Sequence, residues 1–150
     1  MLDEQTIRIR PAAADDYSFA WHLYSSTIRD LTDALMGWNE LKQRESFLAE
    51  WRLEEVRIIV LDGADIGWFQ TAAIDDTIFV KQLYVDPQSQ GRGIGTHVLQ
   101  TVIGEASSKG MSVALAVMKN NPAQRLYRRL GFQTKHADNF KLYMERPLKT

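Results

Sequence analysis

Three alternating glycines give the sequence its clearest indication of chemistry. Gly91, Gly93 and Gly95 lie between a strand-like segment that ends at Val85 and a helical segment that begins near Ile94. The first backbone N–H groups of a helix have no intrahelical partner, and the helix dipole adds partial positive charge there. Because glycine has no Cβ, such a backbone can approach a ligand closely. The spacing therefore predicts a turn that binds phosphate or another anion.

Two better-known phosphate loops do not fit these glycines. A P-loop requires a lysine at the start of the helix, and none stands there. The dinucleotide-binding pattern G-x-G-x-x-G requires two residues between its second and third glycines, whereas here the glycines alternate. The pattern that remains is Q/R-x-x-G-x-G/A, which the segment from Gln90 to Gly95 satisfies.

The composition is that of an ordinary globular domain. A chain of 150 residues can bury a hydrophobic core, and 45% hydrophobic with 25% charged residues is typical of soluble proteins. A formal net charge of -1 gives no sign of bulk binding to nucleic acid. The absence of cysteine excludes disulfides, thiolate metal ligands and a cysteine nucleophile.

Targeting and metal-binding signals are not found in the sequence. The first residues, Met1 to Gln5, are polar and acidic and lack the apolar segment of a signal peptide. No apolar run approaches the ~20 residues that a membrane span needs. His22, His97 and His136 lack metal-ligand spacing. We expect a cytoplasmic protein that binds no metal, no membrane and no nucleic acid.

Hydrophobic periodicity predicts two helices and four strands before the glycine turn. Residues 6–10 alternate as a strand, and helices are expected over 12–35 and from 40 to about 51, with Asn39 as the cap of the second. Strands 56–61, 66–72 and 78–85 follow, joined by turns at Asp62-Gly63 and Asp75-Asp76. We expect these three strands to be antiparallel.

The second half of the sequence continues the alternation of helices and strands. Apolar residues recur at helical spacing over 98–106 and over 123–130, which predicts two helices. The first is expected to end at Gly110 and the second at Gly131. Segments 111–117, 132–135 and 140–144 are expected strands. The order is β-α-α-β-β-β-α-β-α-β-β. It predicts a single α/β (α+β) domain over residues 1–150, with a mixed, mostly antiparallel twisted sheet of 6–7 strands, about four helices and one parallel βαβ crossover.

A second segment makes the sequence resemble a known family. About 30 residues after the glycine turn, Asn120 to Phe132 reads N-N-P-A-Q-R-L-Y-R-R-L-G-F. The sequence resembles the GNAT superfamily of acyl-CoA-dependent N-acyltransferases in these two segments. It also resembles the family in the strand Leu83-Tyr84-Val85-Asp86-Pro87 and in the order of its helices and strands. The resemblance covers nearly the whole chain.

This resemblance implies a binding site for acetyl-CoA. Backbone N–H groups of the turn would bind its pyrophosphate, with the side chain of Arg92 near a phosphate. The strand before the turn would bind the pantetheine arm as an added strand, which requires the strands holding Val85 and Val117 to splay apart. The implied cofactor-binding residues are Leu83, Tyr84, Val85, Gln90, Gly91, Arg92, Gly93, Ile94, Gly95, Thr96 and either Asn120 or Asn121.

The resemblance also implies roles in chemistry and acceptor binding. Tyr127 occupies the position of the tyrosine that protonates the departing thiolate. The acceptor site would be lined by Tyr24, Trp38, Trp68 and Gln82. Some family members carry a glutamate on the strand before the turn or the strand after the helix, but 79–83 and 114–117 contain no carboxylate. Gln82 cannot take a proton, although it could hold a water that does, so no general base is assigned.

The sequence thus predicts an N-acetyltransferase that moves an acetyl group from acetyl-CoA to a primary amine by direct attack. The acceptor would be a small molecule or a peptide. Two alternatives stay open: a non-catalytic acyl-CoA-binding or sensing module, and a protein N-acetyltransferase. A homodimer is also considered, because a closing strand could add its edge to that of a neighbour.

Overall fold

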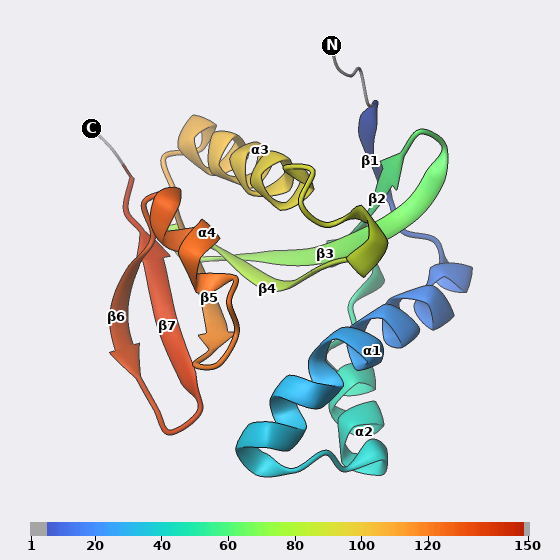
Figure 1. Ribbon diagram of the computed structural model, residues 1–150. Coiled ribbons are helices and arrows are strands. Elements are labelled where there is room, and N and C mark those ends of the chain that lie inside the picture. Colours follow the sequence, from blue (N-terminus) through green and yellow to red (C-terminus); the bar gives the residue numbers. More distant parts are fainter. Residues whose placement is uncertain (1–5, 149–150) are drawn as a thin grey trace. The chain divides into compact units, whose positions relative to one another are not determined.

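The computed structural model describes residues 6–148 as two compact units (Figure 1). The first unit comprises the chain up to Gln70 together with Gln82–Gln90, and the second comprises Thr71–Lys81 together with the chain from Gly91 onward. The segment from Met1 to Gln5, which bears on the expected location in the cell, lies outside the described residues.

The helices and strands follow the predicted order. They are β1 (Ile7–Pro11), α1 (Tyr17–Met36), α2 (Glu40–Glu50), β2 (Val56–Leu61), β3 (Ala64–Ile74), β4 (Thr77–Val85), α3 (Ile94–Ser108), β5 (Ser112–Met118), α4 (Gln124–Arg129), β6 (Gln133–Ala137) and β7 (Lys141–Arg146).

The largest difference from the prediction is the start of α1. Residues 12–16 form a loop and a short 3-10 turn, Ala14–Asp16, and the α-helix begins at Tyr17. The cause is the partly buried Asp16 carboxylate, which accepts the Ala13 N–H at 2.8 Å and both terminal nitrogens of Arg10 at 3.0 and 3.1 Å. These bonds lower the pKa of Asp16, with the Arg10 hydrogen bond as the largest cause. The carboxylate therefore holds the chain in a turn before the helix.

The strands form one mixed sheet in the order β1-β2-β3-β4-β5-β7-β6. In the first unit, β1 and β3 both pair antiparallel with β2. In the second, β4 pairs parallel with β5 from Thr77 opposite Ser112 to Val80 opposite Leu115, and β7 pairs antiparallel with both β5 and β6. The mostly antiparallel sheet and the parallel crossover are confirmed.

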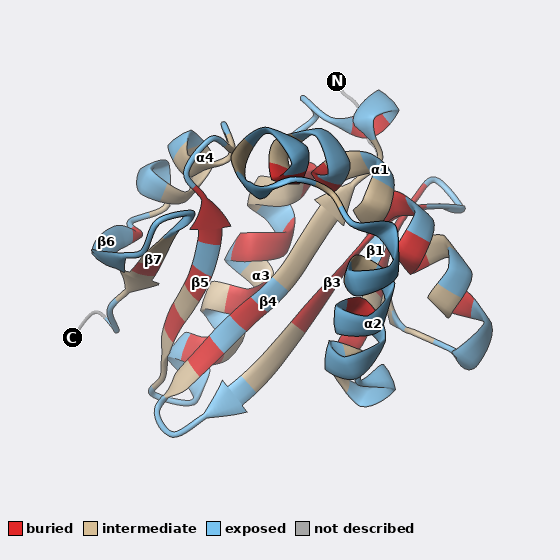
Figure 2. Cartoon of the chain, turned by 90° about the horizontal axis from the view of Figure 1, so that it is seen from below, coloured by how far each residue is buried: buried red, intermediate tan, exposed pale blue. Residues whose placement is uncertain are grey.

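The core of the first unit is rich in aromatic side chains. Trp21 of α1, Phe47 of α2 and Trp68 of β3 are buried together with aliphatic residues of β2. Figure 2 shows a buried stretch of β3 in red. The Phe47 ring lies 5.3 Å from Trp21 and 5.7 Å from Trp68, both edge-on. Edge-on pairs of this kind add to the free energy of burying the rings. This cluster fixes α1 and α2 on β2 and β3.

Asn39 caps α2 as predicted, and this contact provides a test of local stability. Its side-chain oxygen accepts the Lys42 N–H at 3.0 Å, which satisfies one of the unpaired donors of the first turn. The Asn39→Ala variant should lose about 1 kcal/mol of unfolding free energy, measured by urea denaturation. Asn39→Asp keeps the acceptor and should behave as the wild type. A loss in Asn39→Asp equal to that in Asn39→Ala would contradict the capping role.

In the second unit, α3 packs on β5. The buried stripe of the helix is Val98, Leu99, Val102 and Ala106, and the buried residues of the strand include Val113, Leu115 and Val117. Alternate residues of β5 therefore face the helix, which explains the apolar stripe seen in the sequence. Within residues 6–148, no helix is long and apolar enough to cross a membrane.

The edge strand β6 does not favour dimerisation by strand pairing. All five of its residues are exposed, and its register with β7 shifts between Thr134 and His136. Lys135 lies in this irregularity. A charged side chain at an irregular edge strand is a common obstacle to pairing with a second sheet. The homodimer proposed from the sequence would therefore need another surface.

Candidate functional site

The glycine turn enters α3 through two residues in the left-handed region. Gly91 has φ of 83° and Gly93, the residue before the helix, has φ of 77°. A Cβ built on either would have no atom within 4 Å, so these positions require glycine for their backbone conformation and not for lack of space. The space in front of the turn is open to a ligand.

The start of α3 has unpaired donors. The first intrahelical bond runs from the His97 N–H to the Gly93 carbonyl at 2.9 Å, and no side chain caps the helix. The N–H groups of Ile94, Gly95 and Thr96 therefore have no acceptor within the helix. Arg92 is exposed on the same turn. This geometry suits an anion, as the sequence predicts.

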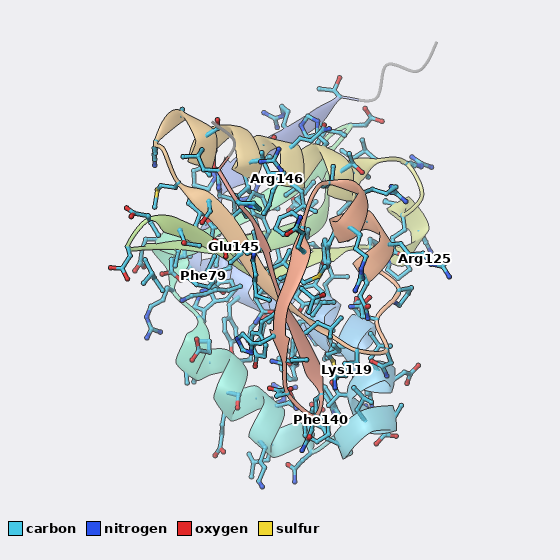
Figure 3. All side chains as sticks on the ribbon, turned by 90° about the vertical axis from the view of Figure 1, so that its left-hand side faces the viewer. Phe79, Lys119, Arg125, Phe140, Glu145 and Arg146 are labelled. Atoms are coloured by element: carbon cyan, nitrogen blue, oxygen red, sulfur yellow. The ribbon has the colours of Figure 1, made fainter. Side chains whose placement is uncertain are left out.

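Gly95 brings α4 against this turn. A Cβ at Gly95 would lie 3.2 Å from the Leu126 side chain of α4, so the two helices approach closely at this point. The other end of α4 is bound to β7, because Arg146 Nε–H donates to the Leu130 carbonyl at 2.9 Å (Figure 3). The second unit thus holds the glycine turn next to α4, the helix that carries Tyr127.

Tyr127 has the properties of a proton donor. Its ring is partly buried and lies 6.1 Å from Phe132 in an edge-on arrangement. Burial raises the pKa of Tyr127 to about 12, so the phenol is protonated at neutral pH. Its hydroxyl has no hydrogen-bond partner within residues 6–148. A ligand can therefore accept its proton without displacing a protein contact.

The structure distinguishes the two neighbouring asparagines. The side-chain oxygen of Asn121 accepts the Ala123 N–H at 2.9 Å, which closes the turn that leads into α4. Asn120 is exposed and has an interaction of its own. Asn121 therefore positions the helix that carries Tyr127, and a cofactor contact from either residue stays a prediction.

In the first unit, the end of β4 is tied to the motif that follows it. Gln90 Nε2–H donates to the Val85 carbonyl at 2.9 Å, and the Asp86 N–H donates to the Ile66 carbonyl at 2.7 Å. The glutamine of the motif therefore fastens the loop to the strand. Leu83, Tyr84 and Val85 are partly buried. Val85 and Val117 belong to different units, so the splay between their strands stays a prediction.

Gly67 of β3 lies against the end of β4, and sequence reasoning missed this contact. A Cβ there would lie 2.5 Å from the Tyr84 carbonyl oxygen and 3.3 Å from Val85 Cα. Only glycine allows the backbone of β3 to lie this close to the end of β4. The available signal was a glycine inside a strand pattern, which marks a close approach of backbones.

Tyr24, Trp38 and Tyr84 form an aromatic wall with polar ends. The Tyr24 ring lies 5.5 Å from Tyr84 and 6.4 Å from Trp38, and all three rings are partly buried. Tyr24 donates its hydroxyl to Gln43, and Tyr84 donates its hydroxyl to Gln82. Burial raises the pKa of Tyr24. The Tyr24 phenol is therefore uncharged at neutral pH.

Trp68 does not belong to this wall, contrary to the expectation from sequence. Its exposed fraction is 0%, and its indole N–H donates to the Ala20 carbonyl at 3.1 Å. A fully covered ring has no surface to offer a substrate, so Trp68 is a core residue. Tyr84, expected only to bind the cofactor through its strand, has the partly exposed ring that contacts Tyr24.

The structure assigns no general base. Gln82 accepts a hydrogen bond from Tyr84 and carries no charge. Within residues 6–148, no three side chains of the metal-binding types lie together. The candidate machinery therefore consists of backbone donors, Arg92 and the Tyr127 phenol.

The chain belongs to the Acetyltransferase (GNAT) family, whose model matches residues 9–132. This span includes the glycine turn and Tyr127, and it covers parts of both units.

A curated relative is the uncharacterized N-acetyltransferase MJ1207 of Methanocaldococcus jannaschii, which is 30% identical over 75 residues. The match covers 49% of this chain and 33% of the relative, so the chain aligns with about a third of that protein.

Solved structures show the same fold. The PaiA N-acetyltransferase of Thermoplasma acidophilum in complex with coenzyme A gives a TM-score of 0.75 at 18% identity, covering 95% of this chain and 99% of that one. The ribosomal-protein-S18-alanine N-acetyltransferase of Escherichia coli gives a TM-score of 0.70 at 20% identity, covering 97% and 96%. N-acetylglutamate synthase of Neisseria gonorrhoeae, complexed with coenzyme A and N-acetyl-glutamate, gives 0.70 at 21%, covering 99% of this chain and 36% of that one.

Proposed function

We propose that the protein is an N-acetyltransferase that transfers the acetyl group of acetyl-CoA to the primary amine of a small molecule or peptide. The observation that carries the proposal is the uncapped turn of α3 packed against the helix that holds Tyr127. Family membership supports the choice of acetyl-CoA as the donor, and so does a structural neighbour solved with coenzyme A.

The residues at hand suit direct attack. The N–H groups of Ile94, Gly95 and Thr96 and the Arg92 guanidinium bind the pyrophosphate. The amine nitrogen attacks the thioester carbon, the C–S bond breaks, and the thiolate takes the proton of Tyr127. The proton released by the amine passes to solvent, which also returns a proton to the tyrosine. No cysteine is present to form an acyl-enzyme.

The binding part of this proposal is tested by Gly93→Ala. An alanine at a left-handed residue strains the turn and places a Cβ where the pyrophosphate approaches. We expect acetyl-CoA affinity to fall about tenfold or more, the equivalent of one lost hydrogen bond to a charged group, measured by isothermal titration of the full chain.

Gly110→Ala is the matched control. Gly110 follows the other end of α3, has φ of 68°, and has no atom within 4 Å of a Cβ built on it. Both variants therefore introduce similar backbone strain, but only Gly93 adjoins the candidate anion site. Equal loss of affinity in the two variants, or no binding of acetyl-CoA by the wild type, would contradict the proposal.

One observation favours a second candidate, an acyl-CoA-binding module without catalysis. Neither β4 nor β5 carries a carboxylate, and Gln82 cannot accept a proton. Binding needs only the turn, whereas catalysis also needs proton transfer. Thiol release from acetyl-CoA over a panel of primary amines decides between the two, since binding without release on any amine favours the module.

A further inference from the structure

The first unit contains a groove that is lined by residues of α1 and α2. It is an open depression of about 640 Å³, which falls within the range of small-molecule sites. From α1 it is lined by Trp21, Ser25 and Arg29, and from α2 by Glu40 and Arg44. None of these residues belongs to the glycine turn, to β4 or to α4.

Arg44 is one of two guanidinium groups in the groove. Its Cζ lies 4.7 Å from the centre of the buried Trp21 ring, within the range of a cation–π contact. Its Nε–H donates to Glu40 at 3.0 Å, and both side chains are about half exposed. An exposed ion pair one helical turn apart contributes little to stability and can open to admit another anion.

Arg29 supplies the second guanidinium. Its Cζ lies 5.9 Å from the centre of the Trp38 ring. The side chain is exposed and makes no hydrogen bond or ion pair within the part of the chain that the structure describes. A guanidinium has five N–H donors, so Arg29 presents its full set to a ligand.

Trp21, which lines the groove, and Trp38, which lies outside its lining, hold these two arginines in place. The Trp21 and Trp38 rings lie 6.5 Å apart, and the Trp38 indole N–H donates to Glu40 at 3.0 Å. The pKa of Glu40 is lowered, first by the Trp38 bond and then by Arg44, with a smaller effect from the charge of Arg29. Two cations and one anion thus share the groove, which leaves it positive.

We propose that this groove is a second binding site, for a ligand that carries a carboxylate group, and that Arg29 and Arg44 bind it. The planar guanidinium matches a carboxylate with two parallel hydrogen bonds. Arg44 already binds one carboxylate here, that of Glu40. The tryptophan faces fix the arginines before the ligand arrives, so little side-chain freedom is lost on binding. The carboxylate belongs either to a small free acid or to an acidic side chain of a peptide.

The test is titration of the full chain, without acetyl-CoA, with succinate and with the uncharged succinamide at constant ionic strength. Heat and tryptophan fluorescence are recorded together, because Trp21 lines the groove and Trp38 contacts Arg29. A second arm uses a blocked tri-glutamate peptide against its tri-glutamine counterpart. We expect saturable binding of at least one acidic probe and of neither neutral one. Arg29→Gln should weaken it about tenfold, the effect of one lost hydrogen bond between charged groups.

Arg57→Gln is the matched control, because Arg57 also lies over an aromatic ring, 4.7 Å from that of Phe69, but outside the groove.

If Arg29 and Arg44 served only to join α1 to α2, Arg29→Gln would lower the unfolding temperature and leave acidic probes as weakly bound as neutral ones. The proposal is overturned by that result, by equal weakening in Arg57→Gln, or by tighter binding of inorganic phosphate than of either acidic probe. Succinate binding indicates a free acid, and binding of the peptide alone indicates an acidic side chain. No arm requires turnover, so the outcome is independent of the acetyltransferase proposal.

Discussion

The Tyr127→Phe variant should turn over about 10²-fold more slowly than the wild type, because a general acid contributes about 10²–10⁴-fold to a rate. Its affinity for acetyl-CoA should stay within about twofold of the wild-type value. The phenol is the group we propose to protonate the thiolate, and removing its oxygen leaves the buried ring and its contact with Phe132 in place. Turnover is measured by thiol release and affinity by titration.

The control for Tyr127 is Tyr17→Phe. Tyr17 packs edge-on against Phe47 at 5.6 Å and Trp51 at 5.2 Å, and its hydroxyl likewise has no hydrogen-bond partner among the described residues. It therefore reports the effect of removing a phenolic oxygen outside the candidate site. Equal rates for Tyr127→Phe and the wild type would remove the tyrosine from the mechanism.

The pKa of Tyr127 predicts a pH profile. A group whose pKa is raised to about 12 stays protonated far above neutrality, so it can donate its proton throughout the range from pH 7 to 10. The wild-type rate should not fall over this range because of the tyrosine. A fall with a midpoint near pH 10 that disappears in Tyr127→Phe would show an ordinary phenol and contradict the effect of burial.

The sequence predicts those parts of the fold that depend on neighbours in the chain. The Asn39 cap, the turn at Asp62-Gly63 and the helix stripe of α3 all follow from patterns a few residues long. The turn at Gly91 and Gly93 belongs to the same group, because a positive φ is a local property of glycine. The element order follows from these signals.

Features that depend on contacts between distant segments are not predictable in this way. Trp68 is a residue type that often binds ligands, but its burial results from packing against α1 and α2, which are distant from it in the sequence. Asp16 ends a short turn and lies outside the α-helix because Arg10 binds it from β1. The contact of Arg44 with Trp21 likewise requires two helices to meet, and neither helix shows it alone.

Gly67→Ala should lower the free energy of unfolding by about 3 kcal/mol, at the upper end of what overpacking a close contact costs. The added Cβ would lie 2.5 Å from the Tyr84 carbonyl oxygen, an atom of the backbone that cannot rotate away. The end of β4 must therefore move away from β3. Because Leu83, Tyr84 and Val85 are proposed to bind the pantetheine arm, acetyl-CoA affinity should fall as well, by about tenfold for one lost hydrogen bond. Urea denaturation and titration measure the two effects.

Gly104→Ala is the control with the opposite expected sign. Gly104 lies in the middle of α3, is exposed, and has no atom within 4 Å of a Cβ built on it. Alanine is the better helix former, so this change should stabilise the protein by about 0.5–1 kcal/mol and leave acetyl-CoA binding unaltered. If Gly67→Ala were as stable as the wild type, the close approach of β3 to the end of β4 would not hold in solution. If it lost stability but kept full affinity for acetyl-CoA, the strand end would be ruled out as a cofactor contact.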